Sequence, residues 1–267
     1  MNENKLLNEP EDKIDWKTIS RYNSLSEDFI EKYADKLNWV FVSTFQILSE
    51  SFIDKHQDKL NWNCISMYQN LSESFIDKHQ DKVNWGYISY FQKLSETFIE
   101  KHADKVNWGY ISNYQKLSES FIEKHQDKVY WNFISAYQTL SESFIEKYKD
   151  KVNFQNISMH QTLSESFIEK YEDKLNWYSL QIRQKLSEQF IEKYLGTRIN
   201  MNHVSKYQKL SDKFCENHEI KSDILNIVHG CGKLNRNIVR YKHNPDIIHI
   251  GCFKGTKDQA IKAIKEK

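Results

Sequence analysis

The sequence predicts an all-α solenoid of short helix-turn-helix repeats, followed by a small C-terminal α/β (β-β-α) module. Three observations support this fold class: a fixed 23-residue period, helical spacing of the apolar residues within each period, and a change of composition after Glu219. A period of roughly 20–50 residues is typical of stacked repeats, in which each unit contacts only its neighbours. An aromatic residue marks the period eight times without an insertion, at Trp16, Trp39, Trp62, Trp85, Trp108, Trp131, Phe154 and Trp177.

Each unit contains two helix starts, as the copy at residues 81–103 illustrates. Asn84 and Ser95 are suited to cap a helix, because their side chains accept hydrogen bonds from the free amides of a first turn. We therefore expect helices over residues 85–93 and 96–105. The links between them are expected to be only one or two residues long, so that consecutive helices form tight hairpins.

The apolar residues of a unit follow helical spacing. Trp85, Ile88 and Phe91 fall at threefold spacing, which predicts one buried stripe on the first helix. Phe98 and Ile99 share a face of the second helix. Helices this short are not stable alone in water, so neighbouring units are expected to bury these faces against one another.

Nine units are expected over residues 12–218, preceded by an N-terminal segment over residues 1–11. The periodicity weakens toward the C-terminal side, where Gly196 lies in a one-residue insertion and Met201 replaces the tryptophan. Altered end units are typical of solenoids, because they cover an exposed core face. The N-terminal segment is polar and acidic, without the apolar core of a signal peptide.

Residues 219–267 are predicted to form a separate module with different chemistry. We expect a linker helix at about residues 222–229. Residues 237–242 and 246–253 have the pattern of short strands joined by a turn. Residues 256–259 form a capping box, which predicts a closing helix.

The composition bears on several function classes. Lys and Arg total 38 and Asp and Glu total 37, so there is no global charge to attract nucleic acid or an anionic membrane. No stretch is long and apolar enough to span a bilayer. The four cysteines are irregularly spaced and do not indicate a disulfide framework. We therefore expect a cytoplasmic protein with reduced thiols and no membrane partner.

No cofactor, metal site or catalytic residue is expected. The recurrent serines occupy cap and close-packing positions, outside any nucleophile-elbow pattern. The candidate zinc ligands lack paired ligand spacing, and two of them fill slots taken by Ile, His or Tyr in other units. These candidates are Cys215, His218, His229, Cys231, His243, His249 and Cys252.

Two periodic polar features are interpreted as structural. Pairs such as Glu100–Lys101 are expected to be solvated charge pairs within a helix. A histidine position recurs with the period, and tyrosine replaces it in other units, which favours packing with a polar tip over a pH sensor. Its histidines are His56, His79, His102 and His125.

Comparison of the units separates fixed from variable positions. The positions one, two and five residues after the tryptophan vary, and they share a helix face away from the Trp–Ile stripe. Aromatic residues on this face suggest a protein interface, and the alternative is that the rings fill gaps between units. The candidate partner-binding residues are Phe41, Thr44, Tyr87, Tyr90, Tyr110, Asn113, Phe133 and Ala136.

The repeat motif resembles tandem repeats in proteins of giant DNA viruses and large phages. The motif consists of L-S-E-x-F-I followed by D-K-x-N-W-x-x-I-S-x-Y-Q, and the tail I-H-I-G-C-F-x-G-T is similar to a closing module of such proteins. The resemblance covers nearly the whole chain. It implies a viral or phage origin, a place in the host cell cytoplasm, and action on a host protein such as a defence or regulatory protein.

These observations predict a non-catalytic binding scaffold that engages a protein partner along one face of the solenoid. Two alternatives stay open. One is a C-terminal module with an enzymatic or small-ligand function that the repeats target. The other is a helical repeat that binds nucleic acid, which would need a basic track with stacking aromatics. The basic residues of each unit are matched by acidic ones, so nucleic acid is the less favoured partner.

Overall fold

The computed structural model describes residues 13–22, 24–218, 226–231, 236–241, 244–250 and 253–256. The chain divides into two compact units, Met1–Gln161 and Thr162–Lys267, and each is described by itself. The helices of the first unit are α2 (Trp16–Tyr22), α3 (Glu27–Lys32), α4 (Trp39–Phe45), α5 (Glu50–Lys55), α6 (Trp62–Tyr68), α7 (Glu73–Lys78), α8 (Trp85–Phe91), α9 (Glu96–Lys101), α10 (Trp108–Tyr114), α11 (Glu119–Lys124), α12 (Trp131–Tyr137), α13 (Glu142–Lys147) and α14 (Phe154–His160).

The second unit continues the same pattern. In the turn between its third and fourth helices, Gly196 has φ +79°, a left-handed conformation that glycine adopts without a steric penalty. With these helices, the described residues contain the nine expected helix pairs. The helices of the second unit are α15 (Glu165–Lys170), α16 (Trp177–Arg183), α17 (Glu188–Tyr194), α18 (Met201–Tyr207) and α19 (Asp212–Asn217).

The two predicted caps are confirmed. The Oδ1 atom of Asn84 accepts hydrogen bonds from the amides of Gly86 and Tyr87 at 3.0 and 3.2 Å. Ser95 Oγ accepts one from the amide of Phe98 at 3.2 Å. The helices are shorter than expected, since α8 ends at residue 91 and α9 at residue 101. The links are correspondingly longer, at residues 92–95 and 102–107.

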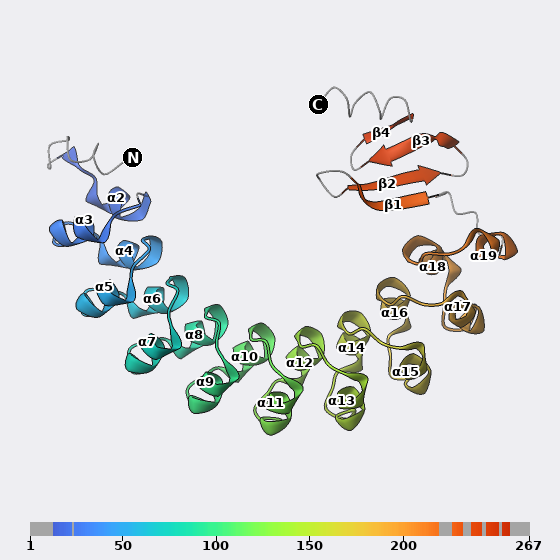
Figure 1. The fold of residues 1–267 in the computed structure, drawn as a ribbon, viewed down its shortest axis with the longest axis horizontal. Helices are drawn as coiled ribbons and strands as arrows, with labels where there is room; N and C mark the ends of the chain where they lie inside the picture. The colour runs from blue at the N-terminus through green and yellow to red at the C-terminus, as the bar shows by residue number, and fades with distance from the viewer. Residues whose placement is uncertain are drawn as a thin grey trace. The chain divides into compact units, whose positions relative to one another are not determined.

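The core is aliphatic at its centre. In Figure 1 the even-numbered helices α2–α14 follow one another in one row and the odd-numbered helices α3–α13 in a second row. Each row contributes a buried aliphatic residue from every helix, and the largest fully buried side chains are all isoleucines. Burial of such side chains supplies the main favourable term in folding. They are Ile30, Ile53, Ile65, Ile76, Ile88, Ile99, Ile111, Ile122, Ile134, Ile145, Ile157 and Ile168.

The predicted stripe on the first helix of each unit is wrong at one position. Ile88 is fully buried and Trp85 is half-buried, but Phe91 is 42% exposed. The buried position beside it belongs to Gln92, whose backbone is extended (φ −87°, ψ 150°) and ends the helix. The last aromatic residue of the helix is therefore left on the surface.

A buried glutamine joins each 23-residue repeat to the repeat before it. Gln92 Nε2 donates to the carbonyls of Ser66 and Gln69 at 3.1 and 2.8 Å, and its Oε1 accepts from the amide of Leu71 at 3.1 Å. These contacts satisfy backbone groups that would otherwise be buried without partners. Among the repeats of residues 1–161, the position is filled by Gln46, Gln69, Gln92, Gln115, Gln138 and Gln161.

A buried serine makes a second connection between units. Ser66 Oγ donates to the carbonyl of Trp62 at 2.7 Å and accepts from the amide of Asn84, in the next unit, at 2.9 Å. The serine thus holds the start of the following even-numbered helix. Its neighbours Ser43 and Ser89 make the same pair of contacts.

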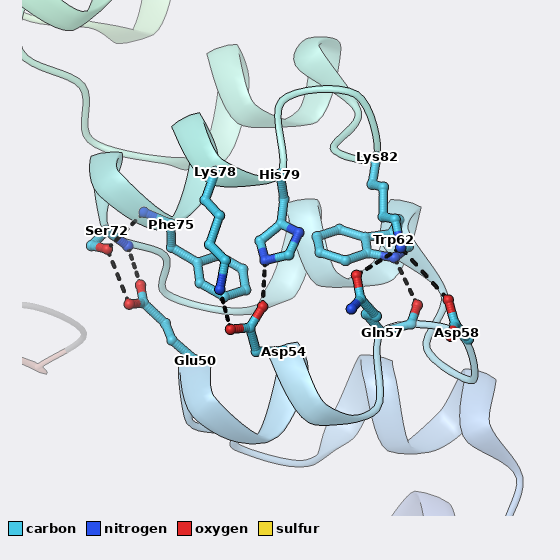
Figure 2. Close-up of polar contacts among 10 residues, drawn as sticks. All are labelled: Glu50, Asp54, Gln57, Asp58, Trp62, Ser72, Phe75, Lys78, His79 and Lys82. Carbon is cyan, nitrogen blue, oxygen red and sulfur yellow. Dashed lines mark hydrogen bonds and ion pairs between the residues drawn. The ribbon is translucent and has the colours of Figure 1, made fainter.

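Polar side chains of the odd-numbered helices also reach across to the next unit. Figure 2 shows Glu50 facing Ser72, and Asp54 facing Lys78 and His79. The Ser72 hydroxyl lies 3.0 Å from Glu50 Oε2, and His79 Nε2 lies 2.7 Å from Asp54 Oδ1. The histidine rings are buried or half-buried against tryptophan and phenylalanine, as expected for packing with a polar tip.

The carboxylate–lysine pairs expected within one helix are formed between units instead. Glu100 pairs with Lys124, which lies 24 residues further along the chain, rather than with the adjacent Lys101. The same connection joins Asp77 to Lys101 at 2.7 Å. Because these side chains are exposed, each pair contributes only a modest stabilisation.

The described part of the tail forms a four-stranded antiparallel sheet of order β1-β2-β3-β4. The predicted hairpin is confirmed by the pairing of β2 with β3. The expected linker helix is wrong over residues 226–229, which belong to a strand. The expected closing helix lies outside the described residues, so the β-β-α module stays a prediction. The strands are β1 (Asn226–Cys231), β2 (Arg236–Tyr241), β3 (Asn244–Ile250) and β4 (Phe253–Thr256).

Within the described residues, none of the helices has the length and apolar character needed to cross a membrane.

Candidate functional site

Six aromatic side chains of the first unit are exposed at the same position of successive repeats, and we call them the aromatic face. Each is the last residue of an even-numbered helix from α2 to α12. They are 42–67% exposed, whereas the aliphatic residue three positions earlier in each helix is at most 5% exposed. A row of large exposed apolar side chains is typical of a binding surface. The aromatic face comprises Tyr22, Phe45, Tyr68, Phe91, Tyr114 and Tyr137.

Four of the residues proposed from the sequence lie beside this face. Tyr87 and Tyr110 are 37% and 39% exposed, and Phe41 and Phe133 are half-buried. Each ring contacts the aromatic-face residue of its own helix, with centroids 5.9–6.3 Å apart. They therefore widen the aromatic face by one ring in four of the five helices α4, α6, α8, α10 and α12, since α6 has Cys64 at this position.

The other four proposed residues are half-buried, and one of them contacts the next helix of the row. Tyr90 is half-buried, and its ring lies 5.2 Å from that of Tyr110 and 4.1 Å from that of Tyr114. A hydrogen bond with the Tyr90 side chain raises the pKa of Tyr114 above its ordinary value. The remaining three side chains are also half-buried: Thr44, Asn113 and Ala136.

Tyr130 was missed by the sequence reasoning and adds a further exposed ring. It occupies the cap position of α12, where α4, α6, α8, α10 and α14 have asparagine, and it makes no side-chain cap bond. The ring is 56% exposed and lies 6.2 Å from that of Phe133. A methyl group added at Gly109 would lie 3.9 Å from the ring, so the ring packs close to that glycine. An aromatic residue thus replaces a cap that usually contributes ~1 kcal/mol.

The charges near the aromatic face are positive. The guanidinium of Arg21 lies over the rings of Tyr22, Phe41 and Phe45, at 4.9, 5.9 and 5.4 Å from their centroids. Lys93 and Lys116 are exposed two residues after the ends of α8 and α10. Helices α2 to α14 of the even-numbered row contain no acidic residue.

The odd-numbered row offers a different surface. An open hollow there is lined by Asp54, Lys78, His79 and Lys82, among others. Figure 2 shows Asp54 paired with Lys78 and His79, whereas Lys82 pairs with Gln57 and Asp58. A hydrogen bond from Lys78 lowers the pKa of Asp54, which makes this carboxylate a poor general base. Within the described residues, no group of His, Cys, Asp or Glu is arranged to hold a metal ion.

The aromatic face combines large rings with adaptable polar groups. Tyrosine hydroxyls lie near small or amide-bearing residues at a neighbouring variable position, the one that follows the tryptophan. This position holds Gly86, Gly109 and Asn132 in successive repeats. This mixture resembles that of antibody binding loops, in which tyrosine supplies rigid contact area and small polar residues supply hydrogen bonds. The arrangement is suited to binding another molecule.

A comparison with protein-family models, with curated proteins and with solved structures found no match to this chain.

Proposed function

We propose that this chain is a non-catalytic binding scaffold that engages a protein partner along the aromatic face. The observation that supports the proposal most directly is the exposure of six rings at one repeat position, beside aliphatic positions that are almost completely buried. Aromatic residues are enriched among the side chains that dominate protein–protein binding energy. The cap lost at Tyr130 adds support, because a sequence that breaks a local stability rule often does so for function.

The proposal includes the origin that the sequence resemblance implies. The partner is then a host defence or regulatory protein, and the chain acts in the host cytoplasm. Residues 219–267 are proposed to form the small α/β module that closes the array, without a catalytic role. Deletion of these residues is expected to leave partner binding intact, which separates a scaffold from a tail-borne activity.

The proposal is tested by removing rings of the aromatic face. Affinity capture from the cells that naturally contain the chain supplies a candidate partner, which is then purified and titrated by calorimetry. Replacement of Phe91, Tyr114 and Tyr137 by serine is expected to weaken binding at least ~100-fold, because buried interface rings contribute ~2 kcal/mol or more each. The triple substitution at Tyr87, Tyr110 and Phe133 tests the rings proposed from the sequence.

The matched control removes three exposed side chains from the odd-numbered helices of the same units, with Lys101, Lys124 and Lys147 replaced by serine. This variant is expected to keep the affinity of the unchanged chain. Thermal unfolding separates binding from packing, since the aromatic-face variant should melt within a few degrees of the unchanged chain. Retained binding by the aromatic-face variant would refute the proposal.

A further inference from the structure

The two rows of helices in the first unit carry different charges. Between Trp16 and Gln161, every Asp and Glu lies in an odd-numbered helix or in the turn that follows it. The even-numbered helices, which carry the aromatic face, have no carboxylate. A partner that approaches the aromatic face meets no negative side chain on these helices.

Three cations beside the aromatic face are available to an anionic group. The guanidinium of Arg21 lies over rings, and no ion pair joins Arg21, Lys93 or Lys116 to a described carboxylate. By contrast, lysines of the odd-numbered row are paired across units, as Lys78 and Lys101 show. Complementary charge steers a partner and favours one of the opposite sign. The partner is therefore expected to be acidic.

The cations are too few for a nucleic acid. Single strands carry a phosphate at every nucleotide, and binding proteins neutralise many of them with Lys and Arg. Here four cations accompany six repeats of the aromatic face, namely Arg21, Lys93, Lys116 and Lys17 of α2. An acidic polypeptide needs fewer charge contacts, because its apolar side chains can supply binding energy at the rings.

The spacing of the rings selects a conformation for that polypeptide. Neighbouring helices pack at ~8–10 Å, so a ring recurs at about that distance along the row. An extended or polyproline-II chain rises ~3.1–3.4 Å per residue and covers one repeat with about three residues. A helical segment, at ~1.5 Å per residue, would need about six or seven. Tyrosine hydroxyls and asparagine amides can bond the free backbone of an extended chain, whereas a helix has already paired its own.

We infer that the aromatic face binds an extended, acidic polypeptide segment whose apolar side chains recur at about every third residue. The segment runs across the even-numbered helices, with its apolar side chains on the rings and its carboxylates near Arg21, Lys93 and Lys116. The inference deepens the proposed function and rests on it.

The test is a selection from a displayed library of random peptides of about 16 residues, long enough to cross about five repeats at ~3 residues each. The library is selected on the full chain and depleted on the variant with Phe91, Tyr114 and Tyr137 replaced by serine. Enriched peptides are expected to carry net negative charge, with apolar residues at i, i+3 and i+6. Synthetic copies are then titrated by fluorescence anisotropy.

Charge removal provides the matched comparison. Lys93→Gln with Lys116→Gln is expected to weaken peptide binding at least ~fivefold, and added salt should weaken it further. Lys101→Gln with Lys124→Gln removes the same charge from the other row of the same units and should change the affinity less than ~twofold. Equal effects of the two pairs would overturn the role of the cations.

The remaining outcomes separate this inference from the proposed function. Neutral or basic peptides, a spacing of about seven residues, or no enrichment over the depleted variant would each overturn the inference. The proposed function would still stand if a purified folded partner bound the unchanged chain but not the variant with Phe91, Tyr114 and Tyr137 replaced by serine. Tight binding of a 20-nucleotide oligothymidine or oligouridine to the aromatic face at physiological salt would overturn both.

Discussion

The buried glutamines show how single residues connect the repeats of the first unit. Each one reaches backbone groups of the preceding unit with both ends of its amide, as Gln92 does with Ser66, Gln69 and Leu71. An aliphatic residue of similar volume could fill the space but could not pair these groups. The same residue type recurs at this position in every unit from the second onward.

Gln92→Leu is expected to lower the free energy of unfolding by ~3–5 kcal/mol. Two carbonyls and one amide would lose their partners, and a buried unsatisfied polar group costs ~1–3 kcal/mol. Chemical denaturation followed by circular dichroism measures the change. Asn70→Leu is the control, because this amide side chain is exposed in the link between α6 and α7, and its change should stay within ~0.5 kcal/mol. Similar losses in both variants would contradict the role given to the buried amide.

His125 differs from the equivalent histidines of the preceding units. The Nε2 atoms of His79 and His102 lie 2.7 and 3.0 Å from an aspartate oxygen. The Nε2 atom of His125 is buried without a hydrogen-bond partner in the described part of the chain. Burial, only partly opposed by the charge of Glu100, lowers the pKa of His125 below its ordinary 6.5.

The stability of the protein is therefore expected to fall as the pH decreases below 6.5. In this range the unfolded chain takes up a proton at His125 that the folded chain does not, so protonation favours unfolding until the pH passes the folded pKa. His125→Tyr should reduce this loss, since tyrosine fills the same position at Tyr148 and Tyr171. Melting temperatures between pH 7.5 and 5.5 measure it. His160→Tyr, an exposed control, should leave the slope unchanged.

At the scale of the element, α12 begins without the cap that α8 and α10 possess. Tyr130→Asn is expected to raise the free energy of unfolding by ~0.5–2 kcal/mol, because it restores a side-chain acceptor for the first turn. The same variant should weaken partner binding, since it removes an exposed ring. The reverse exchange, Asn107→Tyr at α10, should lose a similar amount of stability. If Tyr130→Asn does not raise the free energy of unfolding, the missing cap does not lower the stability of the protein.

The sequence predicted the helix starts well, because a cap depends on a few neighbouring residues. It predicted the helix ends poorly. Phe91 lies three residues after Ile88, so its spacing suggested the core, but the helix stops there and Gln92 takes the buried place. A signal was present in the chain: the equivalent positions hold His160 and Arg183, which a buried apolar slot would not accept.

The error at β1 has a different origin. Residues 222–229 include a short apolar run, and periodicity alone cannot distinguish a strand from a helix over such a length. Ile227 and Val228 are β-branched and favour a strand, and the neighbouring strand β2 supplies the backbone hydrogen bonds. Tyr130 was missed for a related reason, since its role depends on a glycine in the preceding unit rather than on its own helix.

At the scale of the whole molecule, stability is expected to grow with the number of repeats. The polar connections described above mostly join one unit to the next, and a short helix pair cannot bury its own apolar faces. A fragment of residues 81–103 should show little helical circular dichroism. Fragments of residues 35–103, 35–126 and 35–149 should unfold at increasing denaturant concentrations. The dependence of the free energy of unfolding on denaturant concentration (the m-value) should also increase with the length of the fragment.

This series also tests the cooperativity of the array. Substitution of Gln92 by leucine in the fragment of residues 35–149 should lower its midpoint toward that of a shorter fragment, because the connection at that junction is weakened. A single unit with full helical signal, or midpoints independent of length, would contradict the dependence of each unit on its neighbours.

The reach of the glutamine and serine contacts has a further consequence. Each connects adjacent units only, at a constant chain separation, so a whole 23-residue segment can be duplicated or lost while every remaining junction keeps its partners. Tandem copies in a coding sequence change number readily by slippage during replication. Variation among descendants of such a gene would then lengthen or shorten the binding surface one ring at a time, without a new fold having to arise.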